Sequence, residues 1–392
     1  MSLHIDQTEL IALLQSLLRL DTTNPPGNEA AAAQLIADWA RRWGMEAEVM
    51  PVADDRANVL VTVRGSGHRP ALLFNGHTDV VPPGDGWTCD PFGGEVRDSK
   101  VFGRGAADMK GGVAAMLVAM RAVAQMVRRA PHAPPLQGDL MLLGTAGEEV
   151  DHIGAYRFLQ HETAARVGAV VISEPTSLDL VVAHRGAMWV KLTTHGKSAH
   201  GSTPHLGVNA ILHMTHALQR LDRHRFTCTP HPLLAPPTLN VGVIRGGTKE
   251  NVVADRCEVE LDIRIVPSQT PQDVLDELHK LLSELQKETP DFRYDLQLLQ
   301  AQPAVETSPE HPLIQTAQRI ARAMGKEDVT PRSAPYYTDG SVLQPHLKVP
   351  VLICGPGDAA QAHTPDEHVA IERLMQAAAF YAQLAVEWLC HA

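Results

Sequence analysis

The sequence has few of the features that identify secreted, membrane or nucleic-acid-binding proteins. Its five cysteines form no C-x-x-C pair and are odd in number, so a disulfide framework is not expected and a cytoplasmic, reducing compartment fits better. Residues 10–20 are amphipathic and lack the basic flank and apolar core of a signal peptide. No unbroken apolar run reaches about 18 residues, so no membrane span is expected.

Charge and composition narrow the class further. The net charge of −11 is spread along the chain without an acidic tail or a basic run, which argues against nucleic acid as a partner. A hydrophobic content of 44% and a charged content of 20% are ordinary for a folded globular protein. At 392 residues the chain is long enough for two domains, each with its own core.

Two short segments carry the strongest chemical signal. Leu73–Pro82 contains His77 and Asp79 at the end of an apolar run, and the glycine-rich Gly103–Gly112 contains Asp108. A metal centre needs neutral imidazole and ionised carboxylate converging on one point. An isolated His-x-Asp is more often a loop histidine bonded to a carboxylate, so the assignment depends on the rest of the chain.

Further donor residues follow other apolar runs. Residues 140–143, 169–173 and 351–355 read, with the run before His77, as buried strands of a mostly parallel sheet. Ligands of open α/β sheets gather outside the carboxyl ends of the strands. The residues expected to converge there are His77, Asp108, Glu148, Glu149, Glu174 and His363.

The spacing of apolar residues predicts two domains. Residues 7–19, 28–43 and 112–129 have helical periodicity, and the last helix would direct its N-terminal amides at the metal region. From about residue 185 the pattern becomes βαββαβ, the ferredoxin-like order. The strands are expected at 189–194, 238–244, 257–265 and 292–299, and the helices at 207–221 and 271–285. We therefore predict an inserted α+β domain over 185–299 and a catalytic α/β domain over 1–184 and 300–392.

Four motifs together resemble one enzyme family. The chain is similar to the acetylornithine deacetylases, succinyl-diaminopimelate desuccinylases, aminoacylases and carboxypeptidase G, which are two-metal hydrolases. The resemblance implies a zinc-exopeptidase-like catalytic domain and an inserted ferredoxin-like domain used for dimerisation. The motifs are Gly76–Pro82, Gly103–Gly112, Glu148–Glu149 and Gly196–Gly201.

The resemblance also implies a set of metal ligands. His77 and Glu174 would hold one divalent ion, Glu149 and His363 the other, and Asp108 would bridge them. Three carboxylates bring −3 against +4 from two ions, which leaves room for a bridging hydroxide as nucleophile. Zinc is the expected metal, with cobalt or manganese able to substitute.

Glu148 and Asp79 receive catalytic roles by the same resemblance. Glu148 would act as general base and later protonate the leaving amine, because adjacent carboxylates of an extended segment cannot both point at the metals. Asp79 would fix the tautomer of His77 by accepting its second ring N–H. The peptide bond between Asp108 and Met109 is a candidate cis bond.

Residues outside the metal centre are implied in substrate binding. His200 resembles the histidine that the family sends into the active site of its dimer partner to stabilise the oxyanion. Asn251, Arg264 and Thr338 are candidate substrate-binding residues, and Arg264 suits a carboxylate because its planar fork pairs bidentately. For Arg264 the alternative is a paired charge on an exposed strand face.

One loop departs from a branch of the family. Ser341 stands where desuccinylase-like members have a basic residue, which argues against a dicarboxylate acyl group. Tyr336 and Tyr337 indicate a more aromatic pocket, although tyrosines are as often ordinary packing.

The resulting functional prediction is a cytoplasmic homodimeric metallo-amidohydrolase. It would cleave the amide bond of an N-acyl amino acid, as an acetylornithine deacetylase does. A dipeptidase or carboxypeptidase of the same fold is the alternative, since only the pocket would differ. A non-catalytic metal-binding sensor is the alternative from another class, and Glu148 argues against it because a sensor needs no base.

Overall fold

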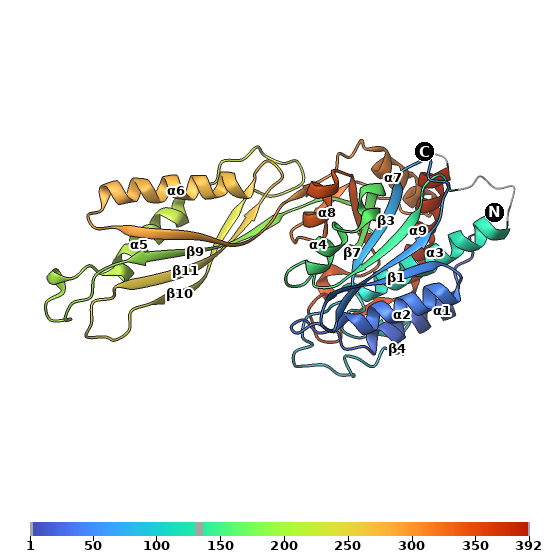
Figure 1. Ribbon diagram of the computed structural model, residues 1–392, viewed down its shortest axis with the longest axis horizontal. Helices are drawn as coiled ribbons and strands as arrows, with labels where there is room; N and C mark the ends of the chain where they lie inside the picture. The colour runs from blue at the N-terminus through green and yellow to red at the C-terminus, as the bar shows by residue number, and fades with distance from the viewer. Residues whose placement is uncertain (1–2, 130–135, 391–392) are drawn as a thin grey trace. The chain divides into compact units, whose positions relative to one another are not determined.

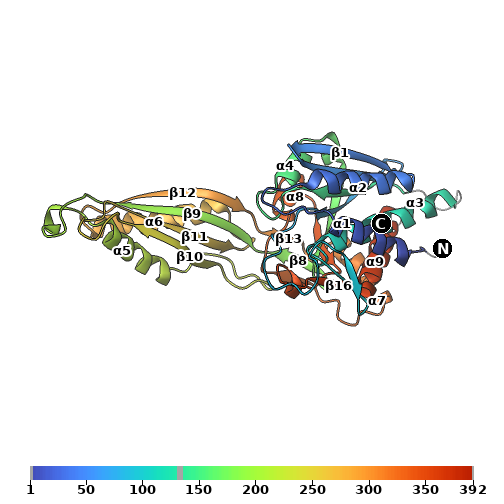
Figure 2. The same cartoon turned by 90° about the horizontal axis from the view of Figure 1, so that it is seen from below.

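The computed structural model describes residues 3–129 and 136–390, which fold into two compact units (Figures 1 and 2). Unit 2 comprises Ala183–Val305 and Ser333–Tyr337, and unit 1 comprises the rest of the described chain. The limits differ by a few residues from those expected at 184/185 and 299/300. In addition, the short stretch Ser333–Tyr337 groups with unit 2.

Unit 1 is built on a mixed sheet. The strand order is β1-β2-β6-β3-β7-β15-β8-β13, with β14 paired to β8. The four central strands, β6, β3, β7 and β15, are parallel, as predicted. The strands are β1 (Glu46–Ala53), β2 (Arg56–Val63), β3 (Ala71–His77), β6 (Leu140–Thr145), β7 (Val167–Pro175), β8 (Val181–His184), β13 (Val305–Glu306), β14 (Arg332–Ala334) and β15 (Val351–Gly355).

The antiparallel flanks were not expected from the apolar runs. β2 runs antiparallel to both β1 and β6, and β8 runs antiparallel to β15. Only residues 54 and 55 separate β1 from β2. A connection of two residues can join antiparallel strands but is too short to join parallel ones. "Mostly parallel" therefore holds for the centre of the sheet, where every residue of β3 and β6 is buried.

Helices cover the sheet of unit 1. In Figure 1, α4 and α8 lie on one side of it, and α1, α2, α3 and α9 on the other. The bounds of α1 and α2 agree with the predicted helices to within one residue, and α3 begins two residues earlier than predicted. The helices are α1 (Gln7–Leu18), α2 (Glu29–Arg42), α3 (Lys110–Arg129), α4 (Ile153–Phe158), α7 (Pro312–Ala323), α8 (Gly340–Leu347) and α9 (Ile371–Cys390).

Helix α3 is the one described helix that is long and apolar enough to cross a membrane, yet 78% of the relevant window is buried inside the protein. It packs against α9 and contacts β3, β6 and β7. Its close approach to β7 requires Gly112, because a Cβ there would lie 2.0 Å from Oγ of Ser173. The start of α3 is thereby fixed beside the end of β7.

A small sheet borders the turn that carries Asp108. Its order is β16-β5-β4, with β4 at Glu95–Arg97, β5 at Lys100–Phe102 and β16 at His368–Ala370. Antiparallel pairing places His368 opposite Phe102. The residues just before β16 therefore lie beside the turn that follows β5.

Unit 2 has the predicted ferredoxin-like βαββαβ order. Its sheet order is β10-β11-β9-β12, and all neighbouring strands are antiparallel. Helix α5 starts later than expected because Asn209 caps it, accepting the N–H groups of Ile211 and Leu212. The elements are β9 (Gly186–His195), α5 (Ala210–Arg223), β10 (Thr238–Gly246), β11 (Arg256–Ile265), α6 (Pro271–Glu288) and β12 (Arg293–Gln302).

The core of unit 2 explains its strand pattern. Residues of β11 alternate between buried and half-buried or exposed, and Val259, Leu261 and Ile263 point into a cluster shared with α5 and α6. Leu278 and Leu282 contribute the α6 side of that cluster. The edge strand β10 is exposed along most of its length.

Candidate metal centre

The donor residues of unit 1 converge at the carboxyl ends of the central parallel strands. His77 is the last residue of β3, Glu174 is the second-last residue of β7, and Glu148 and Glu149 follow β6. Asp108 comes from the turn before α3. Residues far apart in the chain therefore lie together at one edge of the sheet.

Two histidines face opposite oxygens of Asp108. Nε2 of His77 lies 3.2 Å from Oδ1 of Asp108, and Nε2 of His363 lies 3.5 Å from Oδ2. His77 also lies 3.8 Å from Oε1 of Glu174, and His363 lies 3.3 Å from Oε1 of Glu149. A carboxylate between two imidazoles, each with a second carboxylate, is the arrangement expected for a bridge between two cations.

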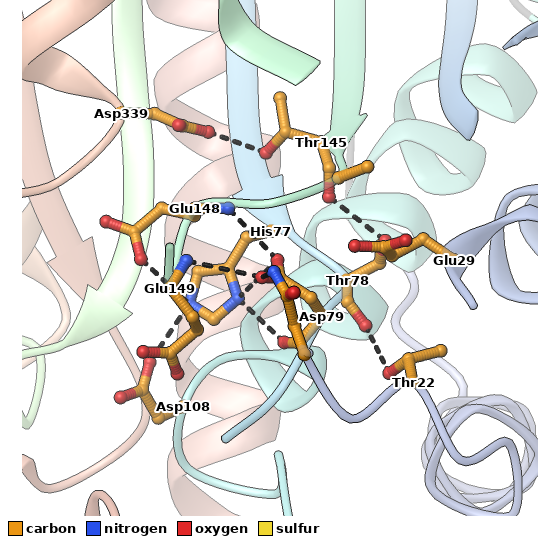
Figure 3. Close-up of polar contacts among 12 residues, drawn as sticks. Thr22, Glu29, His77, Thr78, Asp79, Asp108, Thr145, Glu148, Glu149 and Asp339 are labelled. Carbon is orange, nitrogen blue, oxygen red and sulfur yellow. Dashed lines mark hydrogen bonds and ion pairs between the residues drawn. The ribbon is translucent and has the colours of Figure 1, made fainter. Parts of the chain in front are cut away.

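Distances define two overlapping donor groups that share His77. One contains His77, Asp108 and Glu149, the other His77, Glu148 and Glu174, and within each the candidate ligand atoms lie within 4.8 Å of one another. Figure 3 shows the side chains of His77, Asp108 and Glu149 directed toward one another. Glu148 is thus as close to the other donors as a ligand would be. Distance alone therefore does not decide whether it binds a metal or acts as a base.

Two carboxylates of the site are buried close to each other, and a cation would stabilise them. Glu148 and Glu174 are 6% and 5% exposed. Burial, and then the neighbouring carboxylate of Glu174, raise the pKa of Glu148 well above its usual value. Burial and the carboxylate of Asp108 do the same to the pKa of Glu174. Imidazole and carboxylate donors crowded in this way fit a divalent metal such as zinc, whose charge would offset their repulsion.

The pKa values of both histidines are raised by neighbouring carboxylates, of which Asp108 acts on both. Burial acts to lower the pKa of His77, but Asp108, Glu174 and Glu148 together hold it well above its usual value. Hydrogen bonds to Asp108 and Glu149 raise the pKa of His363 to about 10. A metal ion would compete with these protons for the ring nitrogens.

Asp79 organises the site in a way that differs from the prediction. The second nitrogen of His77, Nδ1, is bonded to the backbone carbonyl of Asp79 at 2.9 Å, whereas the carboxylate lies 3.6 Å away. The carboxylate accepts instead the backbone N–H groups of Glu148 and Glu149, each at 3.2 Å, and Asn24 at 2.9 Å (Figure 3). Asp79 therefore orients His77 through its main chain and fixes the Glu148–Glu149 loop through its side chain.

Two buried acids near the site were not predicted. Asp339 bonds Thr145 at 2.6 Å and His152 at 2.8 Å, and so fixes the end of β6. Glu367 bonds the backbone of the turn that holds Asp108. Asp339 follows the predicted residue Thr338, and Glu367 lies four residues after His363. No sequence pattern, however, distinguishes a buried acid that bonds backbone groups from an exposed one.

Other predicted features of unit 1 are located as follows. The bond between Asp108 and Met109 is cis, as predicted. Thr338 is fully buried, and its Oγ1 accepts the N–H of Gly340 at the start of α8. In this conformation Thr338 holds the helix start and offers no surface to a substrate. Ser341 is buried in the same helix.

His200, Asn251 and Arg264 belong to unit 2. His200 and Asn251 are exposed, and their loops are joined by the bond from the N–H of Gly201 to the carbonyl of Asn251 at 2.8 Å. Arg264 pairs with Asp262 at 2.8 Å, and its side chain is 28% exposed. Its guanidinium also lies 6.0 Å from the ring centroids of Trp189 and Tyr337.

Comparison with known proteins places the chain among amide hydrolases. Acetylornithine deacetylase from Klebsiella pneumoniae (strain 342) is 37% identical over 347 residues, covering 86% of this chain and 85% of that protein. The crystal structure of aminopeptidase PepT from Bacillus cereus ATCC 10987 covers 98% of this chain and 99% of its own, with a TM-score of 0.79 and 20% identity. The Bacillus subtilis YXEP protein, described as a dinuclear metal binding peptidase from the M20 family, covers 98% of each chain with a TM-score of 0.76 and 18% identity.

A family model agrees with these relatives. The description "Peptidase family M20/M25/M40" matches residues 73–387, which include every donor of the candidate metal centre. From the donor residues and the shared family, we conclude that the protein is a metal-dependent hydrolase of amide bonds. The chain belongs to peptidase family M20/M25/M40.

Proposed function

We propose that the protein deacylates an N-acyl amino acid in the manner of an acetylornithine deacetylase. The carrying observation is the pair Glu148–Glu149 on a loop fixed by Asp79, beside two histidines and two further carboxylates. The identity of 37% to an acetylornithine deacetylase over most of the chain supports the acyl-amino-acid class.

The donor geometry supports the following division of ligands. His77 and Glu174 would hold one divalent ion, Glu149 and His363 the other, with Asp108 facing both histidines. Zinc is the proposed metal, with cobalt or manganese able to substitute. When bound, the ions would supply a Lewis acid for the amide carbonyl and lower the pKa of a water molecule.

Glu148 is proposed to move the protons of the reaction. Its carboxylate takes a proton from the attacking water, the water oxygen bonds to the amide carbon, and the C–N bond breaks as Glu148 returns that proton to the leaving nitrogen. The low exposure of Glu148 suits this role, because burial raises its pKa and makes it a stronger base. Asp79 keeps the loop in place during both transfers.

Arg264 and Asn251 are proposed to bind the amino-acid portion of the substrate. Trp189 and Tyr337 flank the Arg264 guanidinium, and Asp262 holds its Nε side. Because Asp262 accepts from Nε and Nη2, the Nη1 group of Arg264 would serve a substrate carboxylate, which it could bind in a fixed direction. Loss of the rings should then weaken carboxylate binding more than it affects the bond-breaking step.

A homodimer is proposed to complete the site. His200, exposed on unit 2, would act on substrate at the metal centre of the second copy and stabilise the oxyanion. Large apolar side chains are exposed on the same unit, including Leu212 at 57% and Ile244 at 53%, and a second copy would cover such groups. The cytoplasm is the proposed compartment, and neither nucleic acid nor membrane is a proposed partner.

A peptidase is the second candidate. The structural similarity to aminopeptidase PepT favours it, but at 20% identity this similarity concerns the fold. Release of free amine from N-acetyl, N-formyl, N-succinyl and N-carbamoyl amino acids and from dipeptides, with added Zn²⁺ or Co²⁺, separates the two. We expect N-acetyl amino acids to be the best substrates and N-succinyl ones to be poor. Faster cleavage of dipeptides than of every acyl amino acid would overturn the deacylase proposal.

A further inference from the structure

Glu367 is a buried carboxylate that belongs to neither donor group. Its side chain is 0% exposed, and it lies four residues after His363 in the segment before β16. No role was predicted for Glu367 from the sequence. Its partners, however, are concentrated on the turn that presents Asp108.

The carboxylate of Glu367 collects the backbone N–H groups of that turn. Oε1 accepts from Ala107 at 2.8 Å, from Asp108 at 3.0 Å and from Gly105 at 3.1 Å. Oε2 lies 3.1 Å from the same Gly105 nitrogen. The backbone nitrogen of the bridging residue itself is therefore held by an ionised side chain, and charge-assisted bonds of this kind are the strong ones.

Arg104 completes the arrangement. Its Nη1 donates to Oε2 of Glu367 at 2.5 Å, Nη2 donates to the carbonyl of Pro83 at 3.1 Å, and the guanidinium lies 5.3 Å from the Trp87 ring. A buried ion pair adds stability only when its remaining polar atoms are satisfied. The remaining lone pairs of the carboxylate are satisfied by the backbone of one turn, so the ion pair and the conformation of that turn depend on each other.

The same segment is fixed to the protein at two neighbouring points. The backbone carbonyl of Glu367 accepts the N–H of Gly103 at 2.9 Å, in line with the pairing of β16 and β5. The carboxylate of Asp366 accepts the N–H and hydroxyl of Thr88 at 2.8 and 2.9 Å. The stretch that begins at His363 is thus attached to the Asp108 turn by both main chain and side chain.

We propose that Glu367 is a positioning residue for the metal centre, which sets the backbone of Asp108 against the segment of His363 before any metal binds. This inference rests on the proposed ligand roles of Asp108 and His363. Donors that are already in place lose less conformational freedom when an ion binds, so affinity for metal is higher. Glu367 itself contacts neither ion nor substrate.

The test compares two buried carboxylates of unit 1. Glu367→Gln keeps the shape and removes the charge that the turn and Arg104 require. Asp139→Asn is the matched control, because Asp139 is also buried and accepts hydrogen bonds from two arginines and a backbone N–H. Asp139 directly precedes β6, whereas the metal centre lies beyond the other end of that strand, at Thr145. Zn²⁺ affinity of the metal-free wild-type protein and of both variants is measured by competition with a chelator.

Expected results separate positioning from stability. Glu367→Gln should weaken Zn²⁺ binding about 10- to 100-fold, the usual effect of losing a residue that orients ligands. Asp139→Asn should change it less than about threefold, although both variants unfold at lower temperature. An unchanged affinity in Glu367→Gln, or an equal loss in Asp139→Asn, overturns the proposal.

A second measurement does not depend on a variant that folds. In metal-free wild-type protein, the amide hydrogens of Ala107 and Asp108 should exchange at least about tenfold more slowly than those of exposed loops, because Glu367 already binds them. Rapid exchange there, with protection appearing only on addition of Zn²⁺, contradicts the proposal. A wild-type protein that binds no divalent ion yet protects these amides would instead contradict the proposed metal centre.

Discussion

Glu149 and His363 face each other at 3.3 Å between Oε1 and Nε2, although 214 residues separate them in the chain. The His363 side chain is 54% exposed, whereas that of Glu149 is only 9% exposed. One side of the candidate centre is thus open to solvent. We propose that these two residues hold the same ion.

Removal of either residue should therefore empty the same position. Glu149→Gln and His363→Ala should each lower the metal content from two ions to about one per chain, because each removes one donor of one ion. Metal analysis after dialysis against dilute Zn²⁺ measures this. The double variant should also retain about one ion. Loss of both ions in the double variant alone would mean that the two residues serve different positions.

Chelation should reversibly abolish activity. Loss of the ions removes positive charge that would offset the buried carboxylates of Glu148 and Glu174, so the protein should also unfold at lower temperature. Free metal at about a hundredfold its Kd contributes about 2.7 kcal/mol per independent site. Zn²⁺, Co²⁺ or Mn²⁺ should restore turnover. Full activity after exhaustive chelation, with metal content below one ion per ten chains, would contradict a metal-dependent reaction.

The sequence was most informative where chemistry coincides with strand ends. His77, Glu174 and the Glu148–Glu149 pair each follow or end a buried strand, so their convergence follows from the parallel centre of the sheet. The roles of Asp79 and Glu367 could not be predicted in this way. Both act on backbone N–H groups, and which main-chain group meets which carboxylate depends on loop conformations that have no periodic signal.

The loop that carries Glu148 should be sensitive to its glycine. Gly147 has φ +81°, and a Cβ there would lie 2.6 Å from Oδ1 of Asp151. Gly147→Ala should lower the free energy of unfolding by about 1–3 kcal/mol and reduce turnover, because the positive φ is strained for alanine and the neighbouring side chains of Asp151 and Arg56 must move.

Gly67 is the control for Gly147, because it has a similar positive φ but no neighbouring atoms where a Cβ would be added. Gly67 has φ +76° with no atom within 4 Å of the added Cβ, so Gly67→Ala should cost only the backbone term, about 1 kcal/mol. Denaturant unfolding and turnover of both variants provide the comparison. Equal turnover in the two alanine variants would indicate that the loop tolerates the added carbon.

His200 should act across the dimer. Homodimers of Glu148→Ala and of His200→Ala should each be inactive. Random mixing makes about half of the dimers mixed, each with one site that has both groups intact, so about a quarter of wild-type activity should return on co-expression.

The mixed-dimer experiment has a clear opposite outcome. If His200 served its own chain, every site in the mixture would lack one group, and no activity would return. Light scattering on the same samples checks that dimers form. A monomeric wild-type protein with full activity would equally exclude the assignment.

The central claim is that Glu148 is the base of a metal-dependent amide hydrolase, and Glu148→Gln tests it most directly. The amide keeps the shape of the side chain and loses the basic oxygen, so turnover of an N-acetyl amino acid should fall about 10²- to 10⁴-fold. Metal content, measured on the same sample, should stay at two ions per chain. Turnover within about tenfold of wild type, or loss of an ion from the variant, would contradict the account.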